Sequence, residues 1–385
     1  MLMQKQIKVL FIRRHLFPQG LEDNCPNAKI LKNFRSRAYL EVETVEYHEE
    51  EWGGREFLRR LVSAARVFRP DVLWLHFNVP NAGVYEAFRE LRVHLGVKIA
   101  MQFGYITHEY KWAKKLLPYV DYIWHGEHSS FARILGGKAI FSPVPPDLAQ
   151  VDHESLPRSI DVSFFGDLSM HPSRRRVLGR LQRSGVHVTI GGGYGSGRLP
   201  AEQYFRILQQ SEIVINFAAV PNGCVVFKGR PFEVFSCGAL LFEEVGTEMD
   251  RICVPGRDYM AYDSELDLLI KLRGILSEPQ KAREIALNGY RRNAELFSID
   301  NVLGLYFRRM GFQLPQTLEL STRFQEYCRL ASEMVSTGAN FPLRKHRNVE
   351  IWKSTRHWLF YQPARGLLGP RTRAWLRGIF SPRHK

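Results

Sequence analysis

The sequence has few cysteines and no long apolar run. Its five cysteines are odd in number, and no two of them form a C-x-x-C pair. A disulfide framework and a structural zinc site are therefore not expected, and this cysteine usage fits a reducing cytoplasm. No apolar run approaches the roughly 18 residues that a membrane-spanning helix needs. The short apolar stretch near the start is interrupted by Arg13 and Arg14, which favours a first strand over a signal peptide.

Several motifs that would mark other functions are also missing. No D-x-D motif follows a predicted strand, and no His/Cys cluster has metal-ligand spacing. G-x-S-x-G and P-loop motifs are absent too, which argues against a serine hydrolase and a P-loop kinase. Because the D-x-D motif and metal-ligand clusters are missing, we expect a site without a metal. No nucleic-acid-binding motif is present, so no nucleic-acid partner is expected, although basic residues leave such a role as a low-ranked alternative.

The net charge of +15 is concentrated at one end of the chain. Residues 341–385 hold 11 Lys and Arg residues and a single acid, Glu350, and so supply +10 of that charge. The first 340 residues carry 43 bases and 38 acids and are nearly balanced. The sequence therefore indicates a nearly neutral body followed by a basic tail that is rich in aromatic residues.

Short apolar runs alternate with helix-like stretches in the first part of the chain. Strands are expected at 7–12, 42–47, 71–77, 97–103 and 120–126, and helices at 26–39, 55–68, 82–95 and 109–117. Such alternation is typical of a parallel sheet with helices on both faces. Prolines then concentrate in SPVPPDL at 142–148, which predicts a linker.

The same alternation restarts after the prolines. Strands are expected at 161–166, 186–193, 212–218 and 238–245, and helices at 173–185, 201–211, 230–238, 264–276, 279–296, 300–310 and 316–336. We therefore predict an α/β protein with two doubly wound, Rossmann-like domains, 1–145 and 146–312, followed by a helix and basic tail at 313–385. Ligands of such domains bind at the carboxyl ends of the strands, which predicts a central cleft between the two.

The strongest site signal is KGRPFE at 228–233. Pro231 suits the first turn of a helix, and Glu233 would lie in that turn, close to Lys228 and Arg230. Two cations and a carboxylate suit a nucleoside diphosphate. The cations would neutralise phosphate charge, and the carboxylate would accept hydrogen bonds from ribose hydroxyls. A surface ion-pair cluster is an equally weighted alternative.

Three weaker features follow other strands of the second half. Gly166 ends a predicted strand and is followed by three arginines that begin at Arg174, an arrangement suited to an anion. Gly192 and Gly193 belong to a glycine loop that a ligand can approach closely. Asn216 ends a third strand. The alternatives are a solvated arginine face, a flexible surface loop and a capping asparagine, and the residues alone leave them open.

Residues 143–312 resemble glycosyltransferases of the two-domain GT-B class, particularly the CgeB-like group related to glycosyltransferase family 4. The resemblance rests on PVPPDL, DVSFFG, KGRPFEVFSCGALLFEE, VPGRDYMAYDSELDLLIKL and REIALNGYRRNAE, in that order. It implies the GT-B fold, with the acceptor side in the first domain and a nucleotide-sugar donor side in the second. The first 140 residues match only in layout.

The resemblance implies roles in binding the donor. Glu233 would bind the ribose, basic residues would hold the diphosphate in place of a metal ion, and the glycine loop would lie near the base. The implied donor-binding residues are Gly20, Gly166, Arg174, Gly192, Gly193, Asn216, Lys228, Arg230 and Glu233. Many family 4 enzymes have a further glutamate eight residues before Glu233, where this chain has Val225, so the donor sugar is not implied.

The first half offers fewer candidate residues. His108 and Glu109 follow the predicted strand at 97–103. His108 loosely resembles a family histidine near the donor sugar, and Glu109 is a candidate general base on an acceptor hydroxyl. The alternative is that both cap and solvate the next helix. Three weaker candidates end or follow neighbouring strands, and for the histidines a place in the core is the alternative: His76, His125 and Glu127.

The function expected from these features is sugar transfer from a nucleotide sugar to a hydroxyl of a bacterial cell-surface glycan or glycolipid. A nucleotide-sugar epimerase and a non-catalytic GT-B-like binding protein are the alternatives. Residues 341–385 combine arginines with Trp352, Trp358 and Trp375, which favours an anionic membrane surface at the inner face of the membrane. Packing on the body and a solvated tail are the other interpretations.

Overall fold

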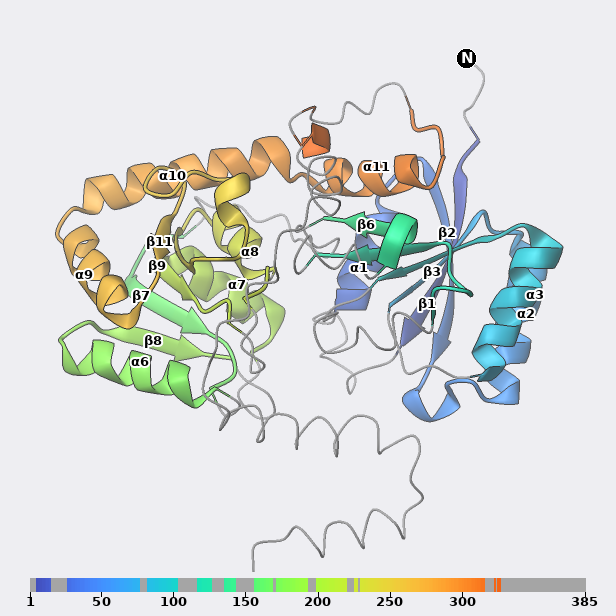
Figure 1. Cartoon of the computed structure of the whole chain (residues 1–385), viewed down its shortest axis with the longest axis horizontal. Helices are drawn as coiled ribbons and strands as arrows, with labels where there is room; N and C mark the ends of the chain where they lie inside the picture. The colour runs from blue at the N-terminus through green and yellow to red at the C-terminus, as the bar shows by residue number, and fades with distance from the viewer. Residues whose placement is uncertain are drawn as a thin grey trace, which may run out of the picture. The chain divides into compact units, whose positions relative to one another are not determined.

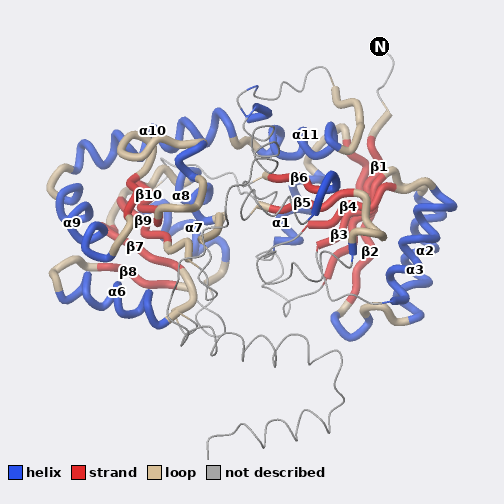
Figure 2. The backbone as a smooth tube through the Cα atoms, viewed as in Figure 1, coloured by secondary structure: helices blue, strands red, loops and turns tan. Residues whose placement is uncertain are grey.

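A computed structural model gives the structure. It describes residues 5–14, 26–76, 82–102, 116–126, 135–142, 156–168, 171–192, 199–219, 225–227, 229–315, 322 and 324–326. These residues contain two parallel sheets, one in each half of the sequence, and each has helices around it (Figures 1 and 2). The α/β prediction is confirmed.

The first sheet has six strands in the order β2-β1-β3-β4-β5-β6, all parallel. They are β1 (Ile7–Arg14), β2 (Leu40–Tyr47), β3 (Val72–His76), β4 (Lys98–Gln102), β5 (Tyr122–His125) and β6 (Ala139–Phe141). Its helices are α1 (Pro26–Arg35), α2 (Arg55–Phe68), α3 (Ala82–Leu95) and the short 3-10 turns η2 (Glu49–Glu51) and η4 (Gly136–Lys138).

Alternating side chains of β1 place apolar residues on both faces of this sheet. Leu10 and Ile12 belong to a core with Leu61 of α2 and Phe88 of α3. Phe11 faces the other way and meets Phe34 of α1 edge-on, with ring centroids 5.8 Å apart. A strand that is apolar on both faces is the expected pattern for a central strand of a parallel sheet.

The second sheet has five parallel strands in the order β11-β10-β9-β7-β8. They are β7 (Ile160–Phe165), β8 (Val188–Gly191), β9 (Ser211–Asn216), β10 (Leu240–Glu244) and β11 (Met260–Tyr262). Its helices are α6 (Pro172–Arg183), α7 (Ala201–Gln210), α8 (Arg230–Ser236), α9 (Glu265–Leu276), α10 (Pro279–Leu296) and the 3-10 turn η5 (Met249–Arg251). Phe164 of β7 packs in a core with Leu178 of α6 and Leu272 of α9, while Phe165 joins the core that contains Phe232 of α8.

Helix α11 (Ile299–Arg309) packs on the first sheet although it follows the elements of the second. The ring of Phe307 lies 5.9 Å from that of Phe34, and the ring of Tyr306 lies 5.7 Å from that of Trp74. Asp300 also forms an ion pair with Arg37. Residues at both ends of the described chain thus build the core of the first sheet.

Two strands were missed from the sequence, and some expected elements fall outside the described residues. The missed strands, β6 and β11, have three residues each, too few to show a periodic pattern. They form by pairing with β5 and β10. The helix expected at 109–117 and the linker after Ser142 lie almost entirely outside the described residues, and the domain boundaries at 145 and 312 stay predictions.

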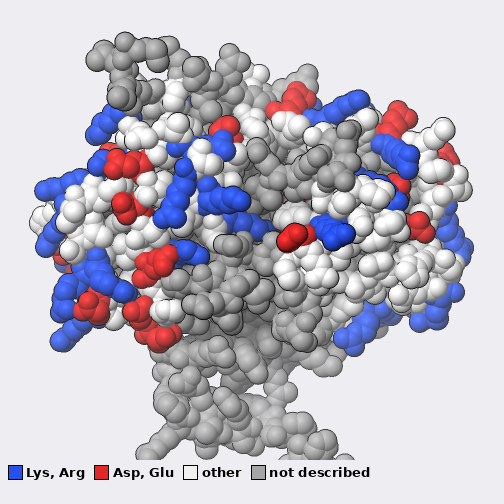
Figure 3. Space-filling model, turned by 180° about the vertical axis from the view of Figure 1, so that it is seen from behind, with Lys and Arg blue, Asp and Glu red and all other residues white. Residues whose placement is uncertain are grey.

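The described surface carries charges of both signs. Figure 3 shows Lys and Arg side chains interspersed with Asp and Glu on the face that it displays. Within the ranges that the structure describes, no helix combines the length and the hydropathy needed to cross a membrane.

Candidate functional site

The carboxyl ends of β7 and β8 meet at two of the glycines singled out from the sequence. The N–H of Gly166 donates to the carbonyl of Gly191 at 3.1 Å. A Cβ on Gly166 would lie 2.9 Å from the ring of Phe164, and Gly192 has a φ of +77°. A Cβ on Gly192 would also lie 3.4 Å from the backbone nitrogen of Gly166. The Phe164 ring therefore leaves no room for a Cβ at Gly166, and the left-handed backbone at Gly192 favours glycine there.

Glu233 lies in the first turn of α8, as the sequence predicts, with Pro231 at the start of the helix. Its Oε2 accepts a hydrogen bond from the hydroxyl of Tyr204 on α7 at 2.6 Å. The same oxygen lies 3.4 Å from Nε of Arg230. About a fifth of each side chain of the Arg230–Glu233 pair is exposed. The carboxylate is thus held by two neighbours and still reaches the surface.

Arg230 connects α8 to the end of β7. Its Nη1 donates to the carbonyl of Phe165 at 2.5 Å, next to Gly166. Its guanidinium carbon lies 5.2 Å from the ring centroid of Tyr204 and 5.9 Å from that of Phe165. The two rings meet edge-on at 5.1 Å with an interplanar angle of 90°. Arg230 thereby brings a positive charge to the ends of the strands while it is held by two aromatic faces.

Tyr204 is a donor that stays neutral over the ordinary pH range. Burial raises its pKa well above 10, and the Glu233 carboxylate raises it further, while Arg230 opposes the shift. A tyrosinate beside this carboxylate would place two negative charges on one hydrogen bond. The hydroxyl therefore donates to Glu233 whenever the carboxylate is ionised.

Arg174 of α6 is buried, with 8% of its surface exposed. Its Nη2 donates to the carbonyl of Phe217, just after β9, at 3.3 Å. Burial lowers the pKa of Arg174 to about 10, and Tyr262 and Glu244 oppose that shift. Arg174 is therefore charged at pH 7, whereas Arg175 next to it is exposed. Of the alternatives drawn from the sequence, a solvated face describes Arg175 but not Arg174.

Asn216 is bonded across the strands of the second sheet. Its Nδ2 donates to Oε2 of Glu243 on β10 at 2.8 Å, and its carbonyl accepts from the hydroxyl of Tyr262 at 2.6 Å. The adjacent Glu244 accepts from the backbone N–H of Ala218 at 3.1 Å. Glu243 and Glu244 are both buried, so the end of β10 carries two buried carboxylates next to the end of β9.

Residues 174–304 match a protein family described as glycosyl transferase-like. This matched stretch, the glycosyl transferase-like segment, contains Arg174, Asn216, Arg230 and Glu233, and it ends within α11. A comparison with curated proteins found no match.

Solved structures that match about 80% of this chain share its two-sheet fold. Sucrose-phosphate synthase from Thermosynechococcus elongatus superposes with a TM-score of 0.53 at 13% identity, over 80% of this chain and 99% of that one. HepE of Anabaena in complex with UDP and glucose gives 0.52 at 12% identity, over 80% and 100%. A glycosyltransferase from Rickettsia africae gives 0.51 at 12%, over 80% and 100%. The predicted GT-B fold is confirmed.

Two groups of residues in the glycosyl transferase-like segment were missed by the sequence analysis. Tyr204 lies in a helix with a regular apolar pattern. An aromatic residue in such a helix is expected from core packing alone, so nothing in the sequence marked it as a binding residue. Glu243 and Glu244 end the apolar run GALLFEE, and two acids closing a buried strand are a signal that the sequence did offer. The structure places all three beside residues that the sequence analysis had singled out.

Several candidates lie outside the described residues. These are Gly20, His108, Glu109, Glu127, Gly193, Lys228 and the side chain of His76. His125 is described and lies in the core, 1% exposed, with its ring 5.3 Å from that of Phe141. Val225, in the place of the family glutamate, is buried and pairs with Ala219 in an antiparallel bridge. Among the described residues, no three His, Cys, Asp or Glu side chains are grouped to hold a metal ion.

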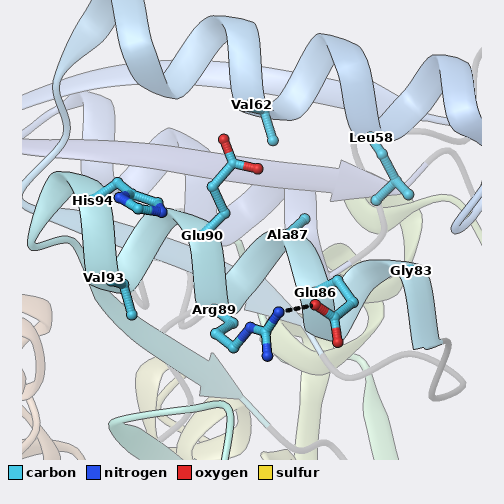
Figure 4. Close-up of a pocket in the computed structure, with 9 residues that line it drawn as sticks. All are labelled: Leu58, Val62, Gly83, Glu86, Ala87, Arg89, Glu90, Val93 and His94. Atoms are coloured by element: carbon cyan, nitrogen blue, oxygen red, sulfur yellow. Dashed lines mark ion pairs between the residues drawn. The ribbon is translucent and has the colours of Figure 1, made fainter.

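A cavity of about 560 Å³ lies between α2 and α3 of the first sheet (Figure 4). Leu58 and Val62 of α2 and Ala87 of α3 contribute apolar side chains to its lining, and Glu86, Arg89, Glu90 and His94 of α3 contribute polar ones. Glu86 and Arg89 form an ion pair of 2.6 Å. It contains none of the candidate residues, and it lies outside the glycosyl transferase-like segment.

Proposed function

We propose that this glycosyltransferase moves a sugar from a nucleoside-diphosphate donor to a hydroxyl of a bacterial cell-surface glycan or glycolipid. The observation that carries the proposal is the match of residues 174–304 to the glycosyl transferase-like family. That stretch contains Arg174, Asn216, Arg230 and Glu233 of the candidate site, and Arg230 reaches from it to the end of β7. The CgeB-like group is the finer placement that its motifs favour.

The chemistry of the site fits a nucleoside diphosphate. Glu233 offers carboxylate oxygens to the vicinal hydroxyls of a ribose, and such charge-assisted hydrogen bonds are stronger than neutral ones. Arg230, Arg174 and Lys228 supply positive charge for the diphosphate that leaves. HepE of Anabaena, which shares the fold, is known in complex with UDP and glucose, which supports a donor of this class.

We propose that this charge replaces a divalent metal. The negative charge that develops on the leaving diphosphate is stabilised by fixed cations already in place before the reaction. Arg230 is held by the Phe165 carbonyl and two rings, so little reorganisation is needed when the charge develops. Glu109 is proposed as the general base on the acceptor hydroxyl, with His108 beside the donor sugar. The reaction takes place in the cytoplasm, and residues 341–385 bring the enzyme to its lipid-linked acceptor.

Calorimetry tests donor binding directly. UDP, GDP, ADP and TDP are titrated into the protein with and without EDTA. We expect micromolar binding of at least one nucleotide, unchanged by EDTA. Binding that disappears with EDTA would contradict the metal-independent site, and no binding of any nucleotide would contradict the donor site.

Variants then assign the residues. Glu233→Ala and Arg230→Ala are each expected to lower turnover about ten- to a hundredfold, because each removes a charge-assisted contact worth about 1.5–3 kcal/mol. Glu265→Ala is the matched control, because it removes an acid of α9 that pairs with Arg180 of α6 and is not part of the candidate site. Full activity in both site variants, with unchanged melting, would show that the site is elsewhere. Donor conversion without any acceptor would instead identify an epimerase.

A further inference from the structure

We propose that Tyr204 is a positioning residue that orients Glu233 toward the donor ribose, so that the site prefers ribonucleotides to 2′-deoxyribonucleotides. The inference rests on the proposed function, because it concerns how the same donor site recognises its ligand. Tyr204 is not expected to touch the reacting atoms. It acts through the Glu233 carboxylate.

One carboxylate oxygen of Glu233 is already bound by other residues of the protein. Both described interactions of Glu233 use Oε2: the 2.6 Å hydrogen bond from Tyr204 and the 3.4 Å approach of the Arg230 Nε. An ionised carboxylate has about four acceptor positions on its two oxygens. Two contacts at Oε2 therefore orient the group and leave acceptor capacity for the two neighbouring hydroxyls of a ribose.

Without these contacts the Glu233 side chain would have to be ordered when the donor binds. Its side chain has several rotatable bonds, and it projects from a helix of only seven residues. Ordering a rotamer-rich side chain at the moment of binding costs conformational entropy and so weakens binding. A hydrogen bond that fixes the carboxylate beforehand removes much of that cost. Because α7 supplies the hydroxyl, the anchor comes from a second, independent element.

The Tyr204 ring is itself held in place by its neighbours. It meets Phe165 edge-on at 5.1 Å and Phe205 at 5.1 Å, and the Arg230 guanidinium lies 5.2 Å from its centroid. These ring contacts do not involve the hydroxyl. Replacement by phenylalanine therefore keeps the packing and removes only the hydrogen bond. The role of the hydroxyl can be separated from the role of the ring.

The experiment compares paired nucleotides in the full-length protein. Dissociation constants of UDP and dUDP, GDP and dGDP, and ADP and dADP are measured by calorimetry for the wild type and for Tyr204→Phe. In the pair that binds, the wild type is expected to prefer the ribonucleotide. Tyr204→Phe is expected to weaken ribonucleotide binding about tenfold, the equivalent of one hydrogen bond, and to leave the deoxynucleotide nearly unchanged. The preference is therefore expected to fall.

Two further variants make the result decisive. Glu233→Gln removes the carboxylate without touching the rings and is expected to lose the same preference. Tyr85→Phe, which removes a buried hydroxyl on α3 of the first sheet, is expected to leave the preference unchanged. A purely structural role of Tyr204 would weaken both members of a pair equally, and that result would overturn the inference. If the wild type binds no nucleotide, the proposed function fails as well, whereas a preference retained in Tyr204→Phe overturns this inference alone.

Discussion

Two arginines of the candidate site show how differently the same residue type can be held. Arg230 lies against two aromatic rings and keeps about a fifth of its side chain exposed. Arg174 is almost fully buried, and its charge is accommodated by the Phe217 carbonyl and by the nearby carboxylate of Glu244. Burying a cation costs free energy unless hydrogen bonds and opposite charge offset it. The Glu244 carboxylate at the end of β10 therefore helps to keep the buried Arg174 charged.

Tyr204 gives a prediction for stability at alkaline pH. The pKa of Tyr204 is raised in the folded state. Its contribution to the free energy of unfolding is therefore fully present below the unfolded-state pKa of about 10, and it is lost as the pH rises above that value. Above about pH 10, the free energy of unfolding of the wild type should fall more steeply than that of Tyr204→Phe, by up to about 1.4 kcal/mol for each pH unit. Urea unfolding of both proteins between about pH 8.5 and pH 11 measures the two slopes. Parallel slopes for the two proteins would contradict the raised pKa.

At the scale of elements, the approach of α10 to α8 depends on one glycine. Gly289 is buried in α10, and a Cβ there would lie 2.4 Å from the Asp258 carbonyl and 2.8 Å from the ring of Phe235 on α8. Because α8 carries Arg230 and Glu233, the spacing of these two helices determines where the site residues lie. Glycine in a helix is unfavourable by itself, so packing explains why it stands here.

Replacing that glycine should therefore destabilise the protein. Gly289→Ala is expected to lower the free energy of unfolding by about 1–3 kcal/mol, because the added methyl group has no room. Gly274→Ala in α9 is the matched control, since nothing lies within 4 Å of its Cβ position. There the change is expected to stabilise by about 0.4–1 kcal/mol. Denaturant unfolding measures both, and an equal response of the two variants would contradict the packing argument.

At the scale of the whole molecule, α11 ties the end of the described chain to its beginning. The Arg37–Asp300 ion pair joins residues that are 263 positions apart. Phe34, Trp74 and Phe307 belong to one core. Contacts of such long sequence separation form late, because loop-closure entropy opposes them until both partners are in place. We therefore expect the core between the first sheet and α11 to form only after α11 has been made.

The basic tail gives the prediction that belongs to this scale. Residues 341–385 lie outside the described structure, and their membrane association stays a prediction. Full-length protein is expected to sediment with phosphatidylglycerol vesicles at low salt and not with neutral vesicles. Replacing Arg371, Arg373 and Arg377 with glutamine should weaken binding by about 3 kcal/mol, at about 1 kcal/mol for each basic residue. Equal amounts of wild type and variant in the supernatant, at every salt concentration, would exclude the tail as an anchor.

Those features of the candidate site that depend on residues adjacent in the sequence could be predicted. Pro231 and Glu233 predicted a helix start with a carboxylate in its first turn, and α8 begins at Arg230 with that geometry. Gly166 was expected at a turn that ends one strand and Gly192 in a glycine loop after the next, and the two lie at adjoining strand ends. In each case the physical cause acts over a few residues, so a local pattern was enough.

What the sequence determined by itself was the order of the main strands and helices, because apolar periodicity records which residues face a core. Only the tertiary structure determines which residues that are distant in the sequence are in contact. It formed β6 and β11, whose three residues become strands only by pairing with a longer neighbour. It also gave Asn216 a glutamate partner on another strand and placed Tyr204 of α7 on Glu233 of α8. No local pattern specifies these contacts, because they depend on how separate elements pack against one sheet.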